Sequence, residues 1–426
     1  MDKTDKRYAA YLDILHEELI PATGCTEPIA IAYAAARARE VLGRLPEHVL
    51  IEASDNIIKN VKSVVVPNTG NLKGIEASAV AGIVAGDAEK VLDVIASVDN
   101  DGRKAITDFL ETKEVKIRTL KSGLLFDLIV TVSSGESSAS VRISHYHTNI
   151  VRITKDEKIV YHNQDCDDIT PSHSTDRSMM TVKDILEFAE SVEISKIEGV
   201  LQRQIDYNMA IAKEGLRGDW GANIGSVLLE TWGDDIKVRA KALPAAGSDA
   251  RMSGCELPVV IVSGSGNQGL TASIPVIEYA HELEIDQKTL YRALVVSNLV
   301  TIHLKTGIGS LSAFCGAVSA GVGAGAGITW LHGGRFEEVA HTIVNALAML
   351  SGIICDGAKP SCAAKIAFAV EAGILGFHMY RKGQQFYGGD GIIQKGVENT
   401  ILNIGRLGRI GMRETDKEIM RIMLSE

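Results

Sequence analysis

Helical periodicity dominates both ends of the chain. Residues 8–20 and 28–43 repeat apolar side chains at the spacing of a packed helix face, and Pro21 and Gly24 separate the two patterns. From about Thr181 the helical spacing returns and continues to the C-terminus. The Ala-rich and Gly-rich runs of this last part predict helices that pack closely against one another.

The middle of the chain has the period of β-strands. Its alternating or β-branched segments are bounded by turn residues, and helical patterns near 76–98 and 101–111 interrupt them. The predicted strand segments are HVLIEASDN, VKSVVVP, VKIRTL, LLFDLIVTVS, SASVRISHYHTNIVRI and KIVYH.

The order of these elements predicts an α+β protein in three parts. We expect N-terminal helices (1–43) that pack on the C-terminal domain, a smaller α+β domain (44–180) and a mainly helical C-terminal domain (181–426). With 426 residues, of which 46% are hydrophobic and 23% charged, the chain is long and apolar enough to bury large cores.

The net charge and the apolar segments indicate which classes of partner and which cellular location to expect. A formal net charge of -10 disfavours nucleic acid and anionic membranes, since both need a basic face. The first residues lack the apolar core of a secretory signal, so we expect a cytoplasmic protein.

The uncharged stretch 306–331 is long enough to span a bilayer, but its Gly, Ala and Ser content predicts a buried helix. Such helices are compatible with a homodimer.

The segment LPVVIVSGSGNQGL has the glycine spacing of a dinucleotide fingerprint at 264–269. The two segments that follow predict helices, whereas a dinucleotide site needs a βαβ unit. We interpret the turn as a helix N-terminus whose amides and side chains bind an anion such as a substrate carboxylate. A purely structural turn is one alternative. Another is a faint similarity, with Lys237, to the lysine and carboxylate loop of pyridoxal-phosphate eliminases. The residues of the turn are Ser265, Gly266, Asn267 and Gln268.

Six cysteines are too few for a disulfide scaffold in a chain of this length. Cys355 and Cys362 flank residues that break a helix, and a bend there would turn both thiols toward one point. Cys315 lies earlier in the same predicted domain. No CxxC pair or histidine at zinc spacing accompanies them, so a three-thiolate iron-sulfur cluster fits better than structural zinc. The spacing alone leaves a second interpretation open, in which these cysteines are small core residues.

Five motifs together resemble the serine dehydratase alpha-chain family, and within it the branch that contains L-cysteine desulfidase. The motifs are PATGCTEPIAIA, DARMSGCELPVVIVSGSGNQG, LSAFCGAVSAG, GIICDGAKPSCAAKI and GGDGIIQKGVENTILNIGRLGRIGM. The resemblance implies a 4Fe-4S cluster bound by Cys315, Cys355 and Cys362, with one iron free of protein thiolate. It also implies a β-eliminating lyase that converts L-cysteine, or L-serine, to pyruvate, ammonia and sulfide, or water. The short interval between Cys355 and Cys362 favours the desulfidase branch.

This chemistry needs a base near the cluster. Cys25 is the first candidate, either as base or as a temporary iron ligand, because amides at a helix start lower the pKa of a thiol. Glu27 is the second candidate, although a glutamate in a first helical turn is also an ordinary dipole partner. Arg251 or Lys359 would supply charge to the substrate carboxylate, and Arg251 has a surface pair with Asp249 as its alternative.

Further candidates for substrate binding, near Cys315, are His303 and Lys305, with a hydrogen-bonded structural histidine as the alternative for His303. The HYHTN segment, 145–149, is interpreted as exposed strand rather than a metal site, and Cys166 and Cys255 as structural. Two other functions remain open for the whole chain. One is a pyridoxal-phosphate-dependent β-eliminase, and the other is a non-catalytic iron-sulfur sensor.

Overall fold

The structure is a computed structural model that describes residues 1–124, 126–163, 175–309 and 312–424. Its strands are β1 (Pro21–Thr23), β2 (His48–Ala53), β3 (Val115–Thr119), β4 (Asp127–Ser134), β5 (Ser137–Ser144), β6 (Ile150–Lys155), β7 (Lys158–His162) and β8 (Pro258–Val260). Its helices are α1 (Lys6–Glu18), α2 (Thr26–Leu42), α3 (Asp55–Val61), α4 (Gly74–Ala85), η1 (Ala88–Asp93), α5 (Asn100–Thr112), α6 (Val182–Ser191), α7 (Ile194–Arg217), α8 (Ile224–Trp232), α9 (Ile236–Met252), α10 (Gly266–Glu282), α11 (Gln287–Ile308), α12 (Gly316–Leu331), α13 (Phe336–Met349), α14 (Cys362–Arg381), α15 (Val397–Arg406), η3 (Leu407–Gly411) and α16 (Arg413–Leu424).

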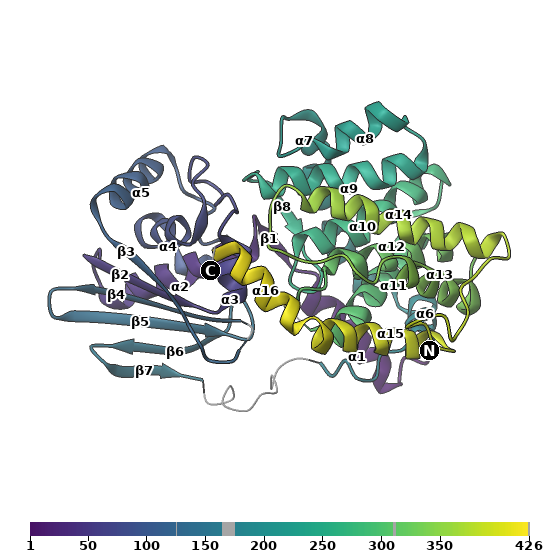
Figure 1. Ribbon diagram of the computed structural model, residues 1–426, viewed down its shortest axis with the longest axis horizontal. Coiled ribbons are helices and arrows are strands. Elements are labelled where there is room, and N and C mark those ends of the chain that lie inside the picture. Colours follow the sequence, from purple (N-terminus) through teal and green to yellow (C-terminus); the bar gives the residue numbers. More distant parts are fainter. Residues whose placement is uncertain (125, 164–174, 310–311, 425–426) are drawn as a thin grey trace.

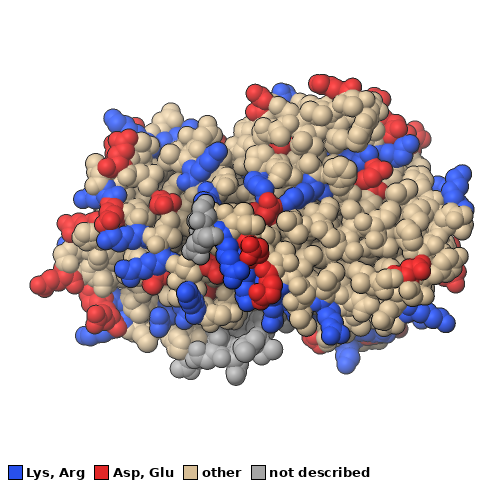
Figure 2. All heavy atoms as spheres, in the orientation of Figure 1, with Lys and Arg blue, Asp and Glu red and all other residues tan. Residues whose placement is uncertain are grey.

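Two lobes lie side by side, as Figure 1 shows. We call the part from α2 to β7 the α+β lobe, and the part formed by α1 and α6 to α15 the helical lobe. Each lobe has its own large cluster of buried apolar side chains. Figure 2 shows charged side chains over the α+β lobe and along the boundary between the lobes, whereas the front of the helical lobe is largely uncharged. The fold class is α+β, as the sequence predicts.

A six-stranded sheet forms one side of the α+β lobe, in the order β3-β2-β4-β5-β6-β7. β2 and β3 are parallel, and the other neighbours are antiparallel. Leu128, Val130 and Val132 alternate along β4 and are fully buried, because α2 packs on β4 and β5. α4 in turn packs on α2.

α12 is the central helix of the helical lobe and contacts α10, α11, α13 and α14. Residues 317–329 are all buried, so the buried helix predicted for 306–331 is confirmed over Gly316–Leu331, whereas residues 306–308 are the end of α11. Its small residues allow close helix contacts: a Cβ built on Gly373 of α14 would lie only 2.3 Å from the carbonyl oxygen of Gly321 on α12. This contact relates the starts of α12 and α14, where two of the predicted cluster cysteines lie.

In the described part of the chain, α14 alone has the length and apolar composition that could cross a membrane. Of its most apolar stretch, 56% is buried within the protein. The buried face packs on α12, α13 and α9, as expected of a core helix.

Two local expectations differ from the structure. The N-terminal helices do not pack together on the helical part: α1 joins the helical core through Tyr11 and Ile14, whereas Ile29 and Ile31 place α2 in the α+β core. α2 is apolar around most of its circumference, so it fits between the sheet and α4. The segment VKSVVVP is not a strand, since it follows α3 as irregular chain with a single bridge from Val65.

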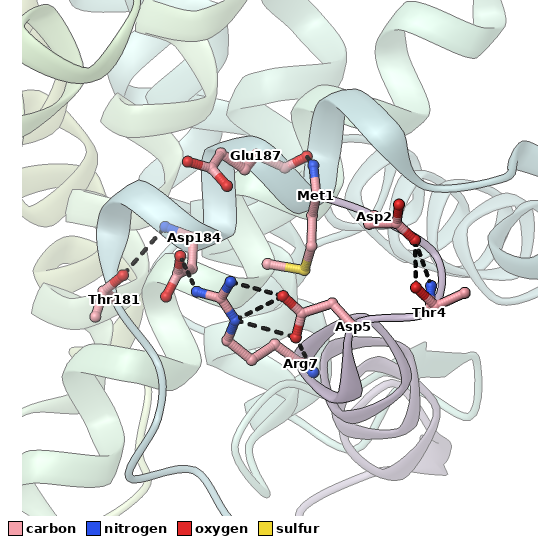
Figure 3. A network of polar contacts seen from close by, with 8 residues as sticks. All are labelled: Met1, Asp2, Thr4, Asp5, Arg7, Thr181, Asp184 and Glu187. Carbon is pink, nitrogen blue, oxygen red and sulfur yellow. Dashed lines mark hydrogen bonds and ion pairs between the residues drawn. The ribbon is translucent and has the colours of Figure 1, made fainter.

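The N-terminus is held on the helical lobe by contacts between α1 and α6, drawn in Figure 3. The Arg7 guanidinium donates to Asp184 at 2.8 Å and to Asp5 at 2.6 Å. The Met1 amino group donates to the carbonyl oxygen of Glu187 at 3.3 Å. The chain then runs through β1, which pairs with β8, to the start of α2 in the other lobe. This path carries residues 25–27 to the boundary between the lobes.

Candidate functional site

A cavity of about 750 Å³ lies at this boundary. The start of α2, α3 and the turn between β5 and β6 line it from the α+β side. The helical lobe contributes α9, the turn before α10, α11 and the start of α12. Both lobes are therefore needed to form the cavity.

The three predicted cluster cysteines all line this cavity. A backbone bridge brings two of them together: the amide of Cys315 donates to Ile353 O at 3.0 Å, and that of Cys355 donates to Ala313 O at 2.6 Å. Cys362 is the first residue of α14, and its thiol lies 3.7 Å from the carbonyl oxygen of Gly357. Burial and the neighbouring Cys355 thiol raise the pKa of Cys315 to about 12. Burial likewise raises the pKa of Cys362, and Cys355 adds to this effect.

No three His, Cys, Asp or Glu side chains among the described residues are grouped to hold a metal ion. Thiolates that ligate a multi-iron cluster bind different irons, so they need not converge as the ligands of one ion do. Three thiols from two segments of the chain around one cavity fit that kind of group in their chemistry.

Cations adjoin these thiols. Burial lowers the pKa of Lys305 to about 8, although the Cys355 and Cys315 thiols act to raise it. Lys365 is paired with Asp356. Positive charge beside the thiols would offset the negative charge of a thiolate-bound cluster.

The turn before α10 forms another wall of the cavity. Ser265 caps the helix by accepting from the Gln268 amide at 3.5 Å, and α10 begins at Gly266. Gly266 leaves room for Arg251, whose Nε would lie 2.4 Å from a Cβ at that position. Arg251 donates from Nη1 to Asn267 Oδ1 at 3.1 Å. The alternative for Arg251, a surface pair with Asp249, does not form, because Asp249 is buried and accepts from two backbone amides.

Two polar atoms at this wall have no partner among the described residues. They are Arg251 Nε and Gln268 Oε1, and both are buried. Arg251 is only 3% exposed and Gln268 only 5%. A buried donor and a buried acceptor without partners are costly, so the site is suited to a ligand that has both an anionic and a cationic group.

Cys25 and Glu27 line the cavity, but the state of Cys25 differs from the prediction. Burial, together with the charge of Glu27, raises the pKa of the Cys25 thiol well above its ordinary value, and this outweighs the helix N-terminus. The thiol donates to Glu27 Oε2 at 3.1 Å. The same oxygen accepts from Thr26 Oγ1 at 3.2 Å, and Oε1 accepts from Asn60 Nδ2 at 3.0 Å.

The charge state of Glu27 follows from these neighbours. Burial acts to raise its pKa, whereas the His147 ring, the Cys25 hydrogen bond and Arg251 act to lower it. The balance lies below the ordinary pKa of glutamate, so Glu27 is a carboxylate.

His147 is the main residue that the sequence interpretation missed. The HYHTN segment is a turn between β5 and β6 rather than exposed strand, and it lines the cavity. The His147 ring packs edge-on against Phe126 with centroids 4.8 Å apart, and its buried Nε2 has no partner within the described chain. Burial lowers the pKa of His147, although Glu27 acts to raise it. The sequence feature that could have predicted this turn is Thr148-Asn149, because these residues favour a turn and break the strand alternation.

Several predicted residues lie elsewhere. His303 Nε2 contacts Glu398 Oε2 at 2.7 Å, and Lys359 pairs with Asp356; neither lines the cavity. Gly266 does not line the cavity, and it contributes to the site because its lack of a side chain leaves room for Arg251. Cys255 is buried in the core of the helical lobe, and Cys166 lies outside the described residues.

The family described as Serine dehydratase alpha chain matches residues 88–421 of this chain. A UPF0597 protein of Desulfitobacterium hafniense is 59% identical over 426 residues, which is 100% of this chain and 99% of that relative. A UPF0597 protein of Lachnoclostridium phytofermentans is 51% identical over 420 residues, 98% of this chain and 100% of the relative. That of Treponema denticola is 44% identical over 431 residues, with 100% of both chains covered.

The relatives' names state no activity, so the functional information lies in the family match, which supports a dehydratase or lyase type of function. The matched range contains the three cavity cysteines, Arg251 and His147, while the relatives also cover Cys25 and Glu27. This protein belongs to the serine dehydratase alpha chain family.

Proposed function

We propose that the protein is an amino-acid β-eliminating lyase that converts L-cysteine and water to pyruvate, ammonia and hydrogen sulfide. L-serine, which would yield pyruvate and ammonia, is the second candidate substrate. One observation carries the proposal: three thiols line the same cavity as a buried arginine beneath a helix N-terminus. The thiols suit an inorganic Lewis acid, and the arginine suits an α-carboxylate.

Cys315, Cys355 and Cys362 would hold a 4Fe-4S cluster, the cofactor type that this family uses. When bound, such a cluster supplies an iron without a protein thiolate, a Lewis acid that favours departure of a β-substituent. The soft sulfur of cysteine suits iron better than the hydroxyl of serine does, which supports L-cysteine as the first candidate.

The wall at α10 would orient the substrate. Arg251 Nε and the amides at the start of α10 donate toward an α-carboxylate. Gln268 Oε1 accepts from the α-ammonium group. Gln268 also adjoins the start of α12, since its Cδ lies 2.7 Å from a Cβ built on Gly316. A substrate held here has its β-substituent within reach of the Cys315 side of the cavity.

The pyridoxal-phosphate alternative has little support from the position of its lysine. Lys237 lies at the start of α9, and its side chain is 52% exposed beside Asp235. It does not line the cavity. A Schiff-base lysine would need to face the substrate, so we do not favour this function. The other alternative, a non-catalytic iron-sulfur sensor, would differ from the lyase in forming no product from either amino acid.

The test is anaerobic purification followed by iron and sulfide analysis and a pyruvate assay with L-cysteine and L-serine. We expect bound iron and sulfide, and pyruvate from at least one substrate. Cys315→Ala should lose most of the iron, whereas the matched Cys255→Ala, away from the cavity, should retain it. A cluster-loaded protein that forms pyruvate from neither amino acid would exclude the lyase and favour the sensor.

The carboxylate site has its own variant. Arg251→Lys keeps the charge but removes the planar donor set, so KM should rise about tenfold, equivalent to ~1.4 kcal/mol. Arg217→Lys is the matched control, because the Arg217 side chain is 81% exposed. An unchanged KM in Arg251→Lys would remove Arg251 from the binding site.

A further inference from the structure

The base that removes the Cα proton is the part of this reaction that the predicted residues do not supply. Glu27 is a carboxylate whose oxygens accept from Cys25 and Asn60, and it shares the single hydroxyl proton of Thr26 with the carbonyl oxygen of Gly264. Each of these donors makes the carboxylate a weaker proton acceptor. Cys25 is itself a protonated thiol and acts as one of the donors.

His147 has what Glu27 and Cys25 lack. Its Nε2 makes no hydrogen bond with any described residue, and the ring lines the cavity. A neutral imidazole with its proton on Nδ1 presents a free lone pair at Nε2. Glu27 lines the same cavity, and its charge acts to raise the pKa of this ring.

The contacts place His147 beside the substrate wall. A Cβ built on Gly264, in the turn before α10, would lie 3.5 Å from Cε1 of the ring. The carbonyl oxygen of the same Gly264 lies 3.1 Å from Thr26 Oγ1, whose proton it shares with Glu27, and this contact ties the turn to the start of α2. The other side of the α10 start adjoins Gly316 through Gln268. The carboxylate wall therefore lies between His147 and Cys315.

We propose that His147 Nε2 is the general base that accepts the Cα proton of the amino-acid substrate, with Glu27 as its countercharge. The inference rests on the proposed function. The Cα–H bond breaks, its electron pair forms the Cα=Cβ bond, and the Cβ–S bond breaks with its pair on the departing hydrosulfide. The proton on His147 then passes to the hydrosulfide or to solvent, which restores the neutral ring. In L-serine the Cβ–O bond breaks instead.

The assignment divides the chemistry between the lobes. The base and its countercharge come from the α+β lobe, whereas the thiols and Arg251 come from the helical lobe. The α+β lobe is then part of the catalytic machinery rather than an accessory domain.

His147→Gln tests the proposal, because glutamine keeps a polar side chain but is no base. We expect kcat for pyruvate formation to fall by about 100-fold or more, while KM and iron content change little. His162→Gln is the matched control, since His162 is an exposed histidine of the edge strand β7. With substrate deuterated at Cα, any residual turnover of His147→Gln should show a larger isotope effect than the wild type.

The pH profile separates a base from a structural residue. The charged and titratable groups that influence His147 are Glu27, which raises its pKa, and Arg251, which lowers it; burial lowers it further. Wild-type kcat/KM should fall at acid pH through a pKa below that of ordinary histidine. This acid limb should be absent from any residual activity of His147→Gln.

A measurement without turnover guards against a variant that does not fold. ¹³C NMR of the histidine Cε1 carbons would follow the titration of His147, with its signal assigned by comparison with His147→Asn. Glu27→Gln should lower the pKa of His147 further, because the raising charge is lost. A pKa unaffected by Glu27→Gln would overturn the pairing.

The outcomes distinguish the two proposals. A wild-type protein with an intact cluster and no pyruvate removes the proposed function, and this inference with it. Normal wild-type turnover, together with His147→Gln within threefold of wild type and an unchanged acid limb, overturns His147 as base and leaves the lyase standing.

Discussion

Cys25 is a hydrogen-bond donor to a buried carboxylate. Its place before α2 indicates a reactive thiolate when only the helix start is considered, because local amides favour negative charge. The tertiary environment reverses this: burial and Glu27 both favour the protonated thiol. We interpret Cys25 as a positioning residue for Glu27.

Cys25→Ala should therefore lower kcat about tenfold, since Glu27 loses one of its donors and with it ~1.4 kcal/mol of orientation. Cys25→Ser should restore most of the activity, because a hydroxyl also donates to a carboxylate. Steady-state kinetics with iron analysis provides the measurement. If the serine variant is as impaired as the alanine variant, the sulfur itself is required, as expected of a temporary iron ligand.

The contact between α12 and α14 positions two of the three cavity thiols. Cys315 directly precedes α12 and Cys362 begins α14, and the helices touch through backbone where glycines meet. Large side chains at this contact would force the helix axes apart. The small residues of α12, whose composition argues against a membrane span, thus allow the close helix contact that positions these thiols.

Gly373→Ala should destabilise the protein by about 1–3 kcal/mol and lower its iron content, because the new methyl group meets the carbonyl oxygen of Gly321. The control is Gly199→Ala on α7, where nothing lies within 4 Å of the added Cβ. That variant should gain about 0.5–1 kcal/mol from helix propensity. Chemical denaturation and iron analysis test both. Equal stability of the two variants would show that the contact is loose.

The two lobes are joined by α16, which runs from the helical lobe onto the α+β lobe (Figure 1). Met420 is buried in the α+β core, and Lys62 Nζ donates to the carbonyl oxygen of Met423 at 2.6 Å. Lys59, whose side chain is 2% exposed, pairs with Asp416. Lys59 also lines the cavity, so the contact of α16 with the α+β lobe reaches a residue of the site.

Asp416→Asn should lower the free energy of unfolding by about 3 kcal/mol, because it leaves a buried ammonium group without its counterion. Glu414→Gln on the same helix removes an exposed pair with Lys417 and should have no measurable effect. Denaturant titrations of the two variants give the comparison. A small effect of Asp416→Asn would mean that Lys59 finds water or another acceptor when Asp416 is changed.

Periodicity predicted the type of most elements. The long apolar spacing of α7, α10 and α11 and the alternation of β4, β5 and β6 are local properties of the chain, so they are readable without a structure. The run VKSVVVP shows the limit, because β-branched residues also fill a core as irregular chain. Similarly, the sequence shows that residues 28–43 are helical but not which core they join.

The α+β class, the family resemblance and three cysteines near breaks in helices can all be read from the amino-acid sequence alone. Folding is what brings these thiols to one cavity with Arg251, keeps Cys25 protonated and puts His147 in the site. Charge states and cavity walls depend on burial and on neighbours from distant segments, as Glu27, His147 and Arg251 illustrate. No local pattern encodes those neighbours, because two lobes must meet before they exist.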